Sequence, residues 1–233
     1  CEYASIFALL GVEVVLIDRA PYPLQFMDRE LVEQFVQGLE HHGGRYLGGC
    51  QIAEVRWDNV AHVVTTLQDG TVIKSEKMLV ALGRQANIED LALSAADITV
   101  SDKGLIPINQ YCQTNIDHIY AVGDMASGPA LASKAMEQGR RAVRHALNLP
   151  IGDAASTIPL GIYTIPEMAS IGLDEKSARE RYKDPLIGRA KFEEIARAQI
   201  SGAGYGLLKM VADPDGERLL GVQIVGDSAT ELV

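Results

Sequence analysis

The feature that most constrains this chain is a short strand that ends in Gly123-Asp124 and leads to a helix of small residues. Residues 119–122 are apolar, and a helix is predicted from about Leu131 to about Leu147. A glycine lets a ligand approach the backbone, an aspartate accepts hydrogen bonds from sugar hydroxyls, and a helix N-terminus offers free N–H groups. The pattern favours an α/β protein that holds a polar, phosphorylated ligand here. The alternative is that Asp124 only caps a turn.

Composition narrows the class of protein. The 233 residues are enough for one large or two modest domains. The net charge is −10 without a basic stripe, which argues against a nucleic-acid binder. No apolar run approaches the roughly 20 residues that span a bilayer, and no targeting peptide is visible. Because Cys1, Cys50 and Cys112 are far apart, we expect no metal site or redox disulfide, and a cytoplasmic location.

The N-terminal region has the order of a nucleotide-binding unit. The pattern of apolar residues predicts a helix at 2–10, which Gly11 ends in a left-handed conformation. It predicts an apolar strand of a parallel sheet at 12–18. Helix, glycine turn and a strand that ends in an acid form the second half of a dinucleotide-binding βαβ unit. The first strand and its Gly-x-Gly-x-x-Gly turn would precede Cys1. We therefore expect the chain to be a fragment cut inside a domain.

Asp18 and Arg19, near the N-terminus, are candidates for a nicotinamide site. Asp18 ends its strand where an acid would bind the adenosine ribose of NAD, although a turn cap explains it equally well. Arg19 suits a 2′-phosphate, so NAD, NADP or both remain open. Glu2 stands at the start of the first helix, where a negative charge favours the helix terminus.

The middle of the chain predicts a capped helix and a set of strands. Asp28 is the expected N-cap of a helix that runs to about His42. His41 and His42 are adjacent and do not face each other on a helix, so helix-end solvation is favoured over metal binding. A strand and an antiparallel meander are expected at 45–47, 51–57, 61–67 and 72–74, and a buried strand of a parallel sheet at 78–83.

The remaining segments predict a linker and an antiparallel domain. Residues 104–109 are expected to be extended, and residues 150–155 form the expected linker. Asp174 caps a predicted helix, and a further helix begins at about Asp227. Strands are expected at 188–192, 206–212 and 219–225, the last two as a hairpin.

The run from Tyr120 to Arg140 resembles the second FAD-binding motif of the two-dinucleotide-domain, FAD-dependent pyridine nucleotide-disulfide oxidoreductases. In that family the aspartate takes a ribityl hydroxyl of FAD. The resemblance implies Rossmann-like parallel sheets of two incomplete domains, NAD(P)-binding at 1–83 and FAD-binding at 84–154. The start of an α+β dimerisation domain follows at 155–233. Flavin-positioning residues implied by the resemblance are Gly123, Asp124, Leu131, Ala132 and Ser133.

The resemblance also implies the cofactors FAD, NAD and NADP and a homodimer formed through 155–233. Glu2 would lie near the nicotinamide and flavin rings as a catalytic residue, paired with a lysine from the missing half. Four residues would hold the nicotinamide cofactor: Asp18, Arg19, Ile52 by the family's adenine-contacting position, and Gly83 in the glycine motif that closes the NAD domain.

Three segments look more like the transhydrogenases of this family than its dihydrolipoamide dehydrogenases: Cys1–Phe7, Ile158–Glu167 and Ala196–Ile200. The implied activity relays hydride between NADPH and NAD+ through bound FAD. The family's redox cysteine pair and C-terminal His-Glu pair lie outside this chain. A disulfide reductase and a non-catalytic, self-associating fragment therefore remain open. We also expect the isolated fragment to bind FAD poorly, because the pyrophosphate loop belongs to the missing N-terminal domain.

Overall fold

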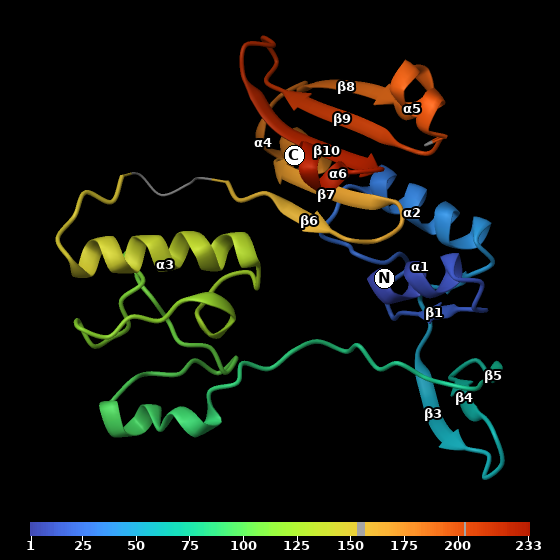
Figure 1. The fold of residues 1–233 in the computed structure, drawn as a ribbon, viewed down its shortest axis with the longest axis horizontal. Coiled ribbons are helices and arrows are strands. Elements are labelled where there is room, and N and C mark those ends of the chain that lie inside the picture. Colours follow the sequence, from blue (N-terminus) through green and yellow to red (C-terminus); the bar gives the residue numbers. More distant parts are fainter. Residues whose placement is uncertain (153–156, 203) are drawn as a thin grey trace. The chain divides into compact units, whose positions relative to one another are not determined.

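The computed structural model describes residues 1–152, 157–202 and 204–233. The chain divides into two compact units, one of Cys1–Leu79 with Pro159–Val233 and the other of Val80–Ile158. Every strand that the described residues form belongs to the first unit, and the longest helix, α3, belongs to the second (Figure 1).

The N-terminal helix is confirmed, and the strand after it is shorter than predicted. Helix α1 spans Glu2–Leu9, and Gly11 follows at φ +83° with its N–H on the carbonyl of Ala8 at 2.9 Å. Strand β1 covers Val15–Ile17 and pairs in parallel with β2, Arg45–Leu47. The side chains of β1 are half-buried, so this strand is not covered on both faces.

Helix α2 spans Arg29–His41 and confirms the predicted cap. Asp28 Oδ1 accepts the backbone N–H of Glu30 at 3.0 Å. Leu31, Phe35 and Leu39 are fully buried on one face of the helix. The predicted meander is also present, as β3 (Ile52–Trp57), β4 (Val63–Leu67) and β5 (Val72–Ser75), all antiparallel.

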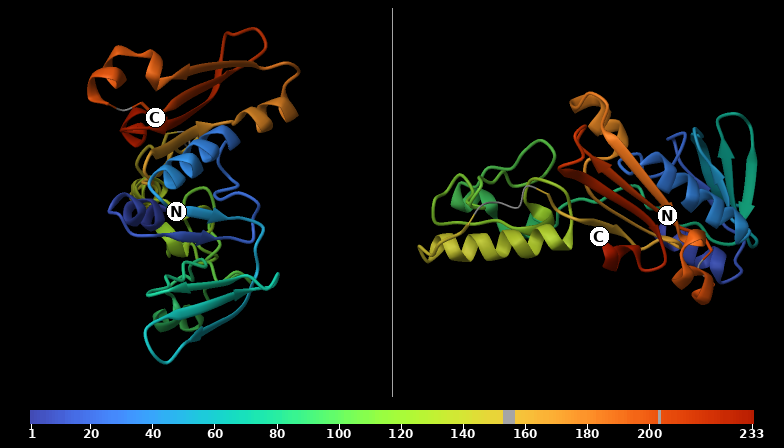
Figure 2. Two further views of the ribbon diagram at one scale, coloured as in Figure 1. Left: turned by 90° about the vertical axis from the view of Figure 1, so that its right-hand side faces the viewer. Right: turned by 90° about the horizontal axis from the view of Figure 1, so that it is seen from above.

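The C-terminal segment forms a five-stranded antiparallel sheet in the order β6-β7-β10-β9-β8. Its orange-to-red strands run side by side in both views of Figure 2. The predicted hairpin β9–β10 is confirmed, as are the Asp174 cap and the helix after Asp227. The bounds are β6 Leu160–Ile162, β7 Glu167–Gly172, α4 Glu175–Arg181, β8 Leu186–Lys191, η4 Phe192–Glu194, α5 Ala196–Ser201, β9 Leu207–Ala212, β10 Leu219–Gly226 and α6 Ala229–Leu232.

The central strands β7 and β10 are covered on both faces, and successive side chains of a strand point to opposite sides. Met168 and Val225 face α2 and pack with its Phe35 in one hydrophobic cluster. Their neighbours Ala169 and Ile224 face the other way, in a cluster with Phe192, Ala198 and Ala229. Helix α2, which precedes the sheet by more than a hundred residues, is therefore part of the sheet's own core.

The second unit contains α3 (Ala132–Ala146), as predicted to within one residue at each end, and three short turns of 3-10 helix. The segments expected to be extended at 104–109 and 119–122 form only isolated bridges, Ile106 with Ala126 and Gln113 with Tyr120. The 3-10 turns are η1 Glu89–Leu91, η2 Leu93–Ala96 and η3 Gly123–Met125.

The predicted buried strand at 78–83 is wrong. These residues form no strand, and Leu79, Val80 and Leu82 are 63%, 65% and 92% exposed. A strand needs a neighbour to take its backbone hydrogen bonds, and no strand among the described residues pairs with this segment. Parallel sheets were expected, but among the strands of the described residues β1–β2 is the one parallel pair. The fold is mixed α/β with small, mainly antiparallel sheets. Part of the expected linker, residues 153–155, lies outside the described residues.

None of the helices built from the described residues has the length and apolar character that a bilayer crossing requires.

Candidate functional site

The Gly123-Asp124 turn is held by a side chain of α3. Val122 is extended, with φ −140° and ψ 161°, and Gly123 turns the chain at φ +79°, a conformation that favours glycine. The backbone N–H of Gly123 donates to Gln138 Oε1 at 2.9 Å. An added Cβ at Gly123 would lie 3.7 Å from the Cβ of Ala135, so the turn packs on the first turn of α3.

A second contact ties the segment before the turn to the C-terminal end of α3. The hydroxyl of Tyr120 and Nδ1 of His145 are 2.7 Å apart. The His145 ring stacks on Tyr111, with centroids 4.5 Å apart. The polypeptide that leads into Gly123 is therefore fixed at two positions along the helix, and this sets the place of Asp124.

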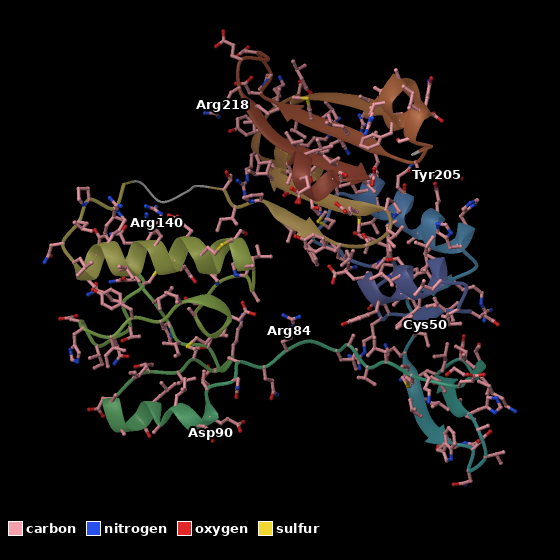
Figure 3. All side chains as sticks on the ribbon, in the orientation of Figure 1. Cys50, Arg84, Asp90, Arg140, Tyr205 and Arg218 are labelled. Atoms are coloured by element: carbon pink, nitrogen blue, oxygen red, sulfur yellow. The ribbon has the colours of Figure 1, made fainter. Side chains whose placement is uncertain are left out.

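The carboxylate of Asp124 is available to a ligand. Its side chain is 56% exposed, and Oδ2 lies 3.9 Å from Nη1 of Arg84, which is itself 85% exposed. Figure 3 labels Arg84 on its extended segment. No donor among the described residues makes a hydrogen bond to this carboxylate. Such a group can accept hydrogen bonds from the hydroxyls of a bound polyol.

The first turn of α3 has the form of a ligand-facing helix end. Leu131 occupies the N-cap position with φ −132° and ψ 136°, and its apolar side chain cannot cap. Ala132 is exposed and Ser133 half-buried. The first backbone N–H groups of a helix have no partner within the helix and favour negative charge. The structure thus brings Gly123, Asp124, Leu131, Ala132 and Ser133 to the same end of α3.

Two buried cations line a cavity of about 210 Å³ farther along the same helix. Lys134 and Arg141 are 5% and 7% exposed. Lys134 Nζ donates to the carbonyl of Ser127 at 3.4 Å, and the guanidinium of Arg141 donates to the carbonyl of Gln110 at 3.3 Å. Burial lowers the pKa of Lys134, and the nearby Asp124 only partly offsets this.

Asp18 and Cys50, which is two residues before Ile52, are joined by a backbone hydrogen bond. Asp18 Oδ1 accepts the N–H of Ala20 at 3.0 Å, which is the turn-cap role that the sequence left open. The Asp18 carbonyl accepts the N–H of Cys50 at 3.0 Å, so the chain that enters β3 at Ile52 passes beside it. Ile52 is 40% exposed, and Arg19 is exposed.

Gly83 is not in this group. It belongs to the second unit, whereas Asp18, Arg19 and Ile52 belong to the first. Its φ of +87° is a glycine conformation, and a Cβ added there would meet nothing within 4 Å.

Glu2 is engaged by the protein itself. Its Oε1 accepts the backbone N–H of Tyr163 at 2.9 Å. One turn later, Ser5 Oγ accepts the N–H of Ile165 at 3.0 Å and donates to the Glu2 carbonyl. Helix α1 is thereby attached to the segment that joins β6 and β7.

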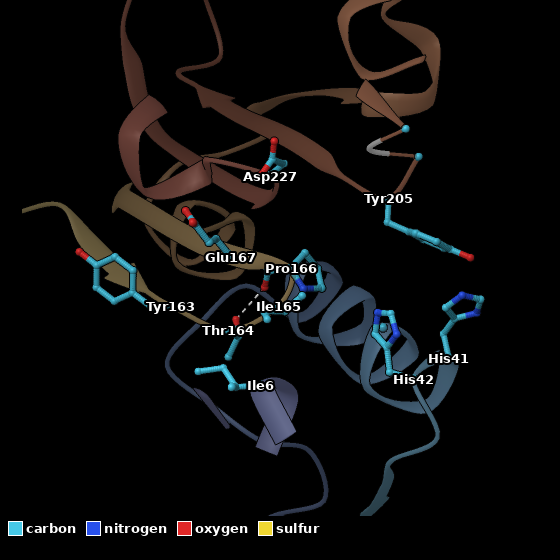
Figure 4. A pocket seen from close by; sticks show the side chains of 13 residues that line it. Ile6, His41, His42, Tyr163, Thr164, Ile165, Pro166, Glu167, Tyr205 and Asp227 are labelled. Carbon is cyan, nitrogen blue, oxygen red and sulfur yellow. Dashed lines mark hydrogen bonds between the residues drawn. The ribbon is translucent and has the colours of Figure 1, made fainter. Parts of the chain in front are cut away.

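That segment borders a cavity of about 490 Å³ in the first unit (Figure 4). His41 and His42, which the sequence assigned to a solvated helix end, both line it. The His41 ring centroid lies 5.3 Å from that of His42 and 5.7 Å from that of Tyr205. Within the described part of the chain, no group of three or more His, Cys, Asp or Glu side chains is arranged to hold a metal ion.

Sequence reasoning missed Lys134, Gln138 and Arg141. The signal was present, because their spacing places them on one face of the predicted α3. A polar row on a helix usually indicates a solvated face, whereas here Lys134 and Arg141 are buried.

Comparison with known families gives two matches. The family described as pyridine nucleotide-disulphide oxidoreductase matches residues 1–139. The dimerisation domain of pyridine nucleotide-disulphide oxidoreductases matches residues 158–233.

Curated relatives match the whole chain but only part of their own length. The soluble pyridine nucleotide transhydrogenase of Mycobacterium tuberculosis (strain ATCC 25177 / H37Ra) is 39% identical over 232 residues, which cover 100% of this chain and 49% of the relative. That of Marinomonas sp. (strain MWYL1) is 36% identical over 233 residues, with 100% and 50% covered. The chain therefore spans about half the length of the curated relatives it matches.

Solved structures share the fold. LpdA from Mycobacterium tuberculosis superimposes with a TM-score of 0.90 at 23% identity, over 99% of this chain and 50% of LpdA. The HOCl-induced flavoprotein disulfide reductase RclA from Escherichia coli gives a TM-score of 0.89 at 24% identity, over 98% of this chain and 53% of RclA.

Proposed function

The chain belongs to the pyridine nucleotide-disulphide oxidoreductase family, and we propose that it carries cofactor-binding and dimerisation parts of a transhydrogenase. In this proposal the native protein relays hydride between NADPH and NAD+ through bound FAD. The observation that carries the proposal is the Asp124 carboxylate, exposed beside the Gly123 turn and the N-terminus of α3. The 39% identical relative named a soluble pyridine nucleotide transhydrogenase supports this choice of reaction.

The residues at this end of α3 fit the ribityl and flavin part of FAD. Asp124 would accept a hydrogen bond from a ribityl hydroxyl, and Gly123 leaves room for the ligand beside the backbone. The backbone at Leu131, Ala132 and Ser133 would face the flavin ring. Bound FAD supplies the hydride-transfer chemistry, and the protein supplies orientation and electrostatics.

We assign the nicotinamide cofactor to Asp18, Arg19 and Ile52 of the first unit, and we propose Gly83, in the second unit, as a further cofactor-binding residue. Asp18 would bind ribose hydroxyls with the carboxylate oxygen that the Ala20 N–H does not occupy. Arg19 would meet a 2′-phosphate, and Ile52 would contact the adenine. Glu2 is proposed as the catalytic residue beside the reacting rings, a role in which its bond to the Tyr163 N–H would fix its carboxylate.

The proposal includes a domain organisation and an assembly. Its boundaries are NAD(P)-binding 1–83, FAD-binding 84–154 and dimerisation 155–233. The match of the dimerisation domain to residues 158–233 supports a homodimer formed through that region. A cytoplasmic location completes the proposal.

The test uses the native protein that carries this sequence. NADPH-to-NAD+ hydride transfer is assayed without any dithiol, and flavin content is measured from the visible absorbance. For Asp124→Ala we expect at least about a tenfold loss of flavin affinity, because a charge-assisted hydrogen bond contributes about 1.5–3 kcal/mol. Asp117→Ala, an exposed aspartate of the same unit, is the matched control.

Two results would redirect the proposal. Activity that appears only with dihydrolipoamide would replace the transhydrogenase by a disulfide reductase. Full flavin content in Asp124→Ala would remove this carboxylate from the site. A protein that forms dimers but lacks both flavin and activity would leave the self-associating, non-catalytic alternative.

A further inference from the structure

Among the described residues, the side chains that line the 210 Å³ cavity between α3 and residues 108–112 include two buried cations, Lys134 and Arg141, and one carboxylate, Glu137. Lys134, Gln138 and Arg141 share one face of α3 and line it. Nζ of Lys134 bonds only to the neutral carbonyl of Ser127 among the described residues, at 3.4 Å. Its ammonium forms no ion pair with any carboxylate of the described chain.

In the part of the chain that the structure describes, Arg141 also has little negative charge beside it. Its guanidinium donates to the carbonyls of Gln110 and Gly152 at 3.3 and 3.4 Å. The carboxylate beside it is that of Glu137, 3.9 Å from Nη1. Glu137 is already paired with Arg140, at 2.6 Å. Among the described residues, Arg141 therefore has one carboxylate nearby, which Arg140 holds more closely, and Lys134 has none within ion-pair distance.

An unbalanced buried charge is costly, because the low dielectric of the interior weakens its solvation. An anion that enters such a cavity gains the full attraction of both cations. The cavity has room, since a water occupies roughly 30 Å³ and the space is several times larger. The lowered pKa of Lys134 agrees with a cation that the protein alone does not compensate.

We propose that this cavity binds a free oxyanion of phosphate size between the Lys134 ammonium and the Arg141 guanidinium. Gln138 contributes a third donor. Its Oε1 accepts the N–H of Gly123, which leaves the Nε2 hydrogens for the anion. The site is separate from the carboxylate of Asp124 and does not depend on the function proposed above.

The test is the thermal-unfolding midpoint of the full chain as inorganic phosphate is raised, against sodium chloride at matched ionic strength. A ligand that binds only the folded state raises this midpoint with its concentration. Lys134→Met should weaken phosphate binding by about tenfold or more, because hydrogen bonds to charged groups are the strong ones. Lys103→Met removes an exposed lysine of the same unit and should behave like wild type.

A second variant keeps the test decisive if Lys134→Met fails to fold. Glu137→Gln removes the carboxylate that competes with the anion for Arg141, so it should bind phosphate severalfold more tightly. An equal rise of the midpoint in phosphate and in sodium chloride, or unchanged phosphate binding in both Lys134→Met and Glu137→Gln, would overturn the site.

Discussion

The two units each bury a lysine, and they treat it in opposite ways. Lys209 on β9 has a side chain that is 3% exposed, with Nζ 2.8 Å from Asp28, 2.8 Å from Glu30 and 2.7 Å from Glu175. Lys134 on α3 has one neutral carbonyl at 3.4 Å. Burial lowers the pKa of Lys209, but the hydrogen bonds that its ammonium donates to these carboxylates more than offset this and raise it. Burial lowers the pKa of Lys134.

The difference indicates that the charge of Lys209 stabilises the fold, whereas the charge of Lys134 is available to a ligand. Lys209 connects β9 to the N-termini of α2 and α4, and Arg189 on β8 joins the cluster by pairing with Glu30 at 2.6 Å. Asp28 caps α2 with one oxygen and accepts from Lys209 with the other. Such saturation leaves nothing for a ligand. Lys134 and Arg141 have no such set of carboxylates among the described residues, which is why we assign an anion to that cavity and none to this cluster.

The largest change in the free energy of unfolding is expected when Lys209, which bonds to three carboxylates, is replaced. Lys209→Met removes the buried ammonium that Asp28, Glu30 and Glu175 share, and Asp28 then stays buried without a cation. We therefore expect the free energy of unfolding to fall by about 3–5 kcal/mol. Lys134→Met removes an uncompensated cation and should change it by no more than about 1 kcal/mol, or increase it. Urea unfolding followed by circular dichroism measures both. Equal losses in the two variants would break the contrast.

A second prediction concerns Gln138, which joins the cavity to the Gly123 turn. Gln138→Leu removes the acceptor of the Gly123 N–H and should cost about 1 kcal/mol, with faster hydrogen exchange at that amide. Gln138→Glu keeps an acceptor and adds a negative charge beside Lys134 and Arg141. It should preserve protection of the amide while weakening phosphate binding, and loss of protection in Gln138→Glu would contradict this role.

Acid unfolding should reveal the contribution of the cluster formed by Lys209, Arg189, Asp28, Glu30 and Glu175. Glu30 accepts hydrogen bonds from Arg189, which has the larger effect, and from Lys209. These bonds lower the pKa of Glu30 from 4.5 to about 2, although burial acts to raise it. A lowered carboxyl pKa contributes stability above pH 4.5 that is lost as the pH falls toward 2. For Arg189→Gln we expect a loss of about 1 kcal/mol or less at neutral pH, because the pair is partly exposed and screened.

The difference between Arg189→Gln and wild type should shrink toward zero across that acid range. Arg29→Gln, which breaks the exposed pair with Glu33, is the control and should show little difference at any pH. A wild-type minus Arg189→Gln difference that stays constant from neutral pH to pH 2 would exclude Glu30 as its source.

The smallest effect is expected at Arg84. Its pair with Asp124 spans 3.9 Å between exposed side chains, so Arg84→Gln should alter the free energy of unfolding by less than about 0.5 kcal/mol. If Arg84 instead holds the segment around residue 84 on the turn, the thermal midpoint of Arg84→Gln will fall as clearly as that of Gln138→Leu.

Local signals in the sequence were sufficient for many elements. The Asp28 and Asp174 caps, the α3 helix and the β9–β10 hairpin all follow from a cap residue, a helical period or a turn within a few residues. The set around Gly123 could also be proposed from its motif, although its binding role remains a prediction.

Features that depend on contacts between residues far apart in the sequence could not be predicted from local patterns. The apolar run at 78–83 has the composition of a buried strand, yet a strand is defined by a neighbour, and no described strand pairs with it. The inward direction of Lys134 and Arg141 likewise depends on which side of α3 meets residues 108–112.

The sequence by itself determined where helices start, where strands turn and which carboxylate follows Gly123, because those preferences act within a few residues. Only the tertiary structure decided that Lys209 meets Asp28 across 181 residues and that Ser5 meets Ile165 across 160. Electrostatic energy depends on distance in space, so the same residue type becomes a structural anchor in one unit and an unbalanced charge in the other.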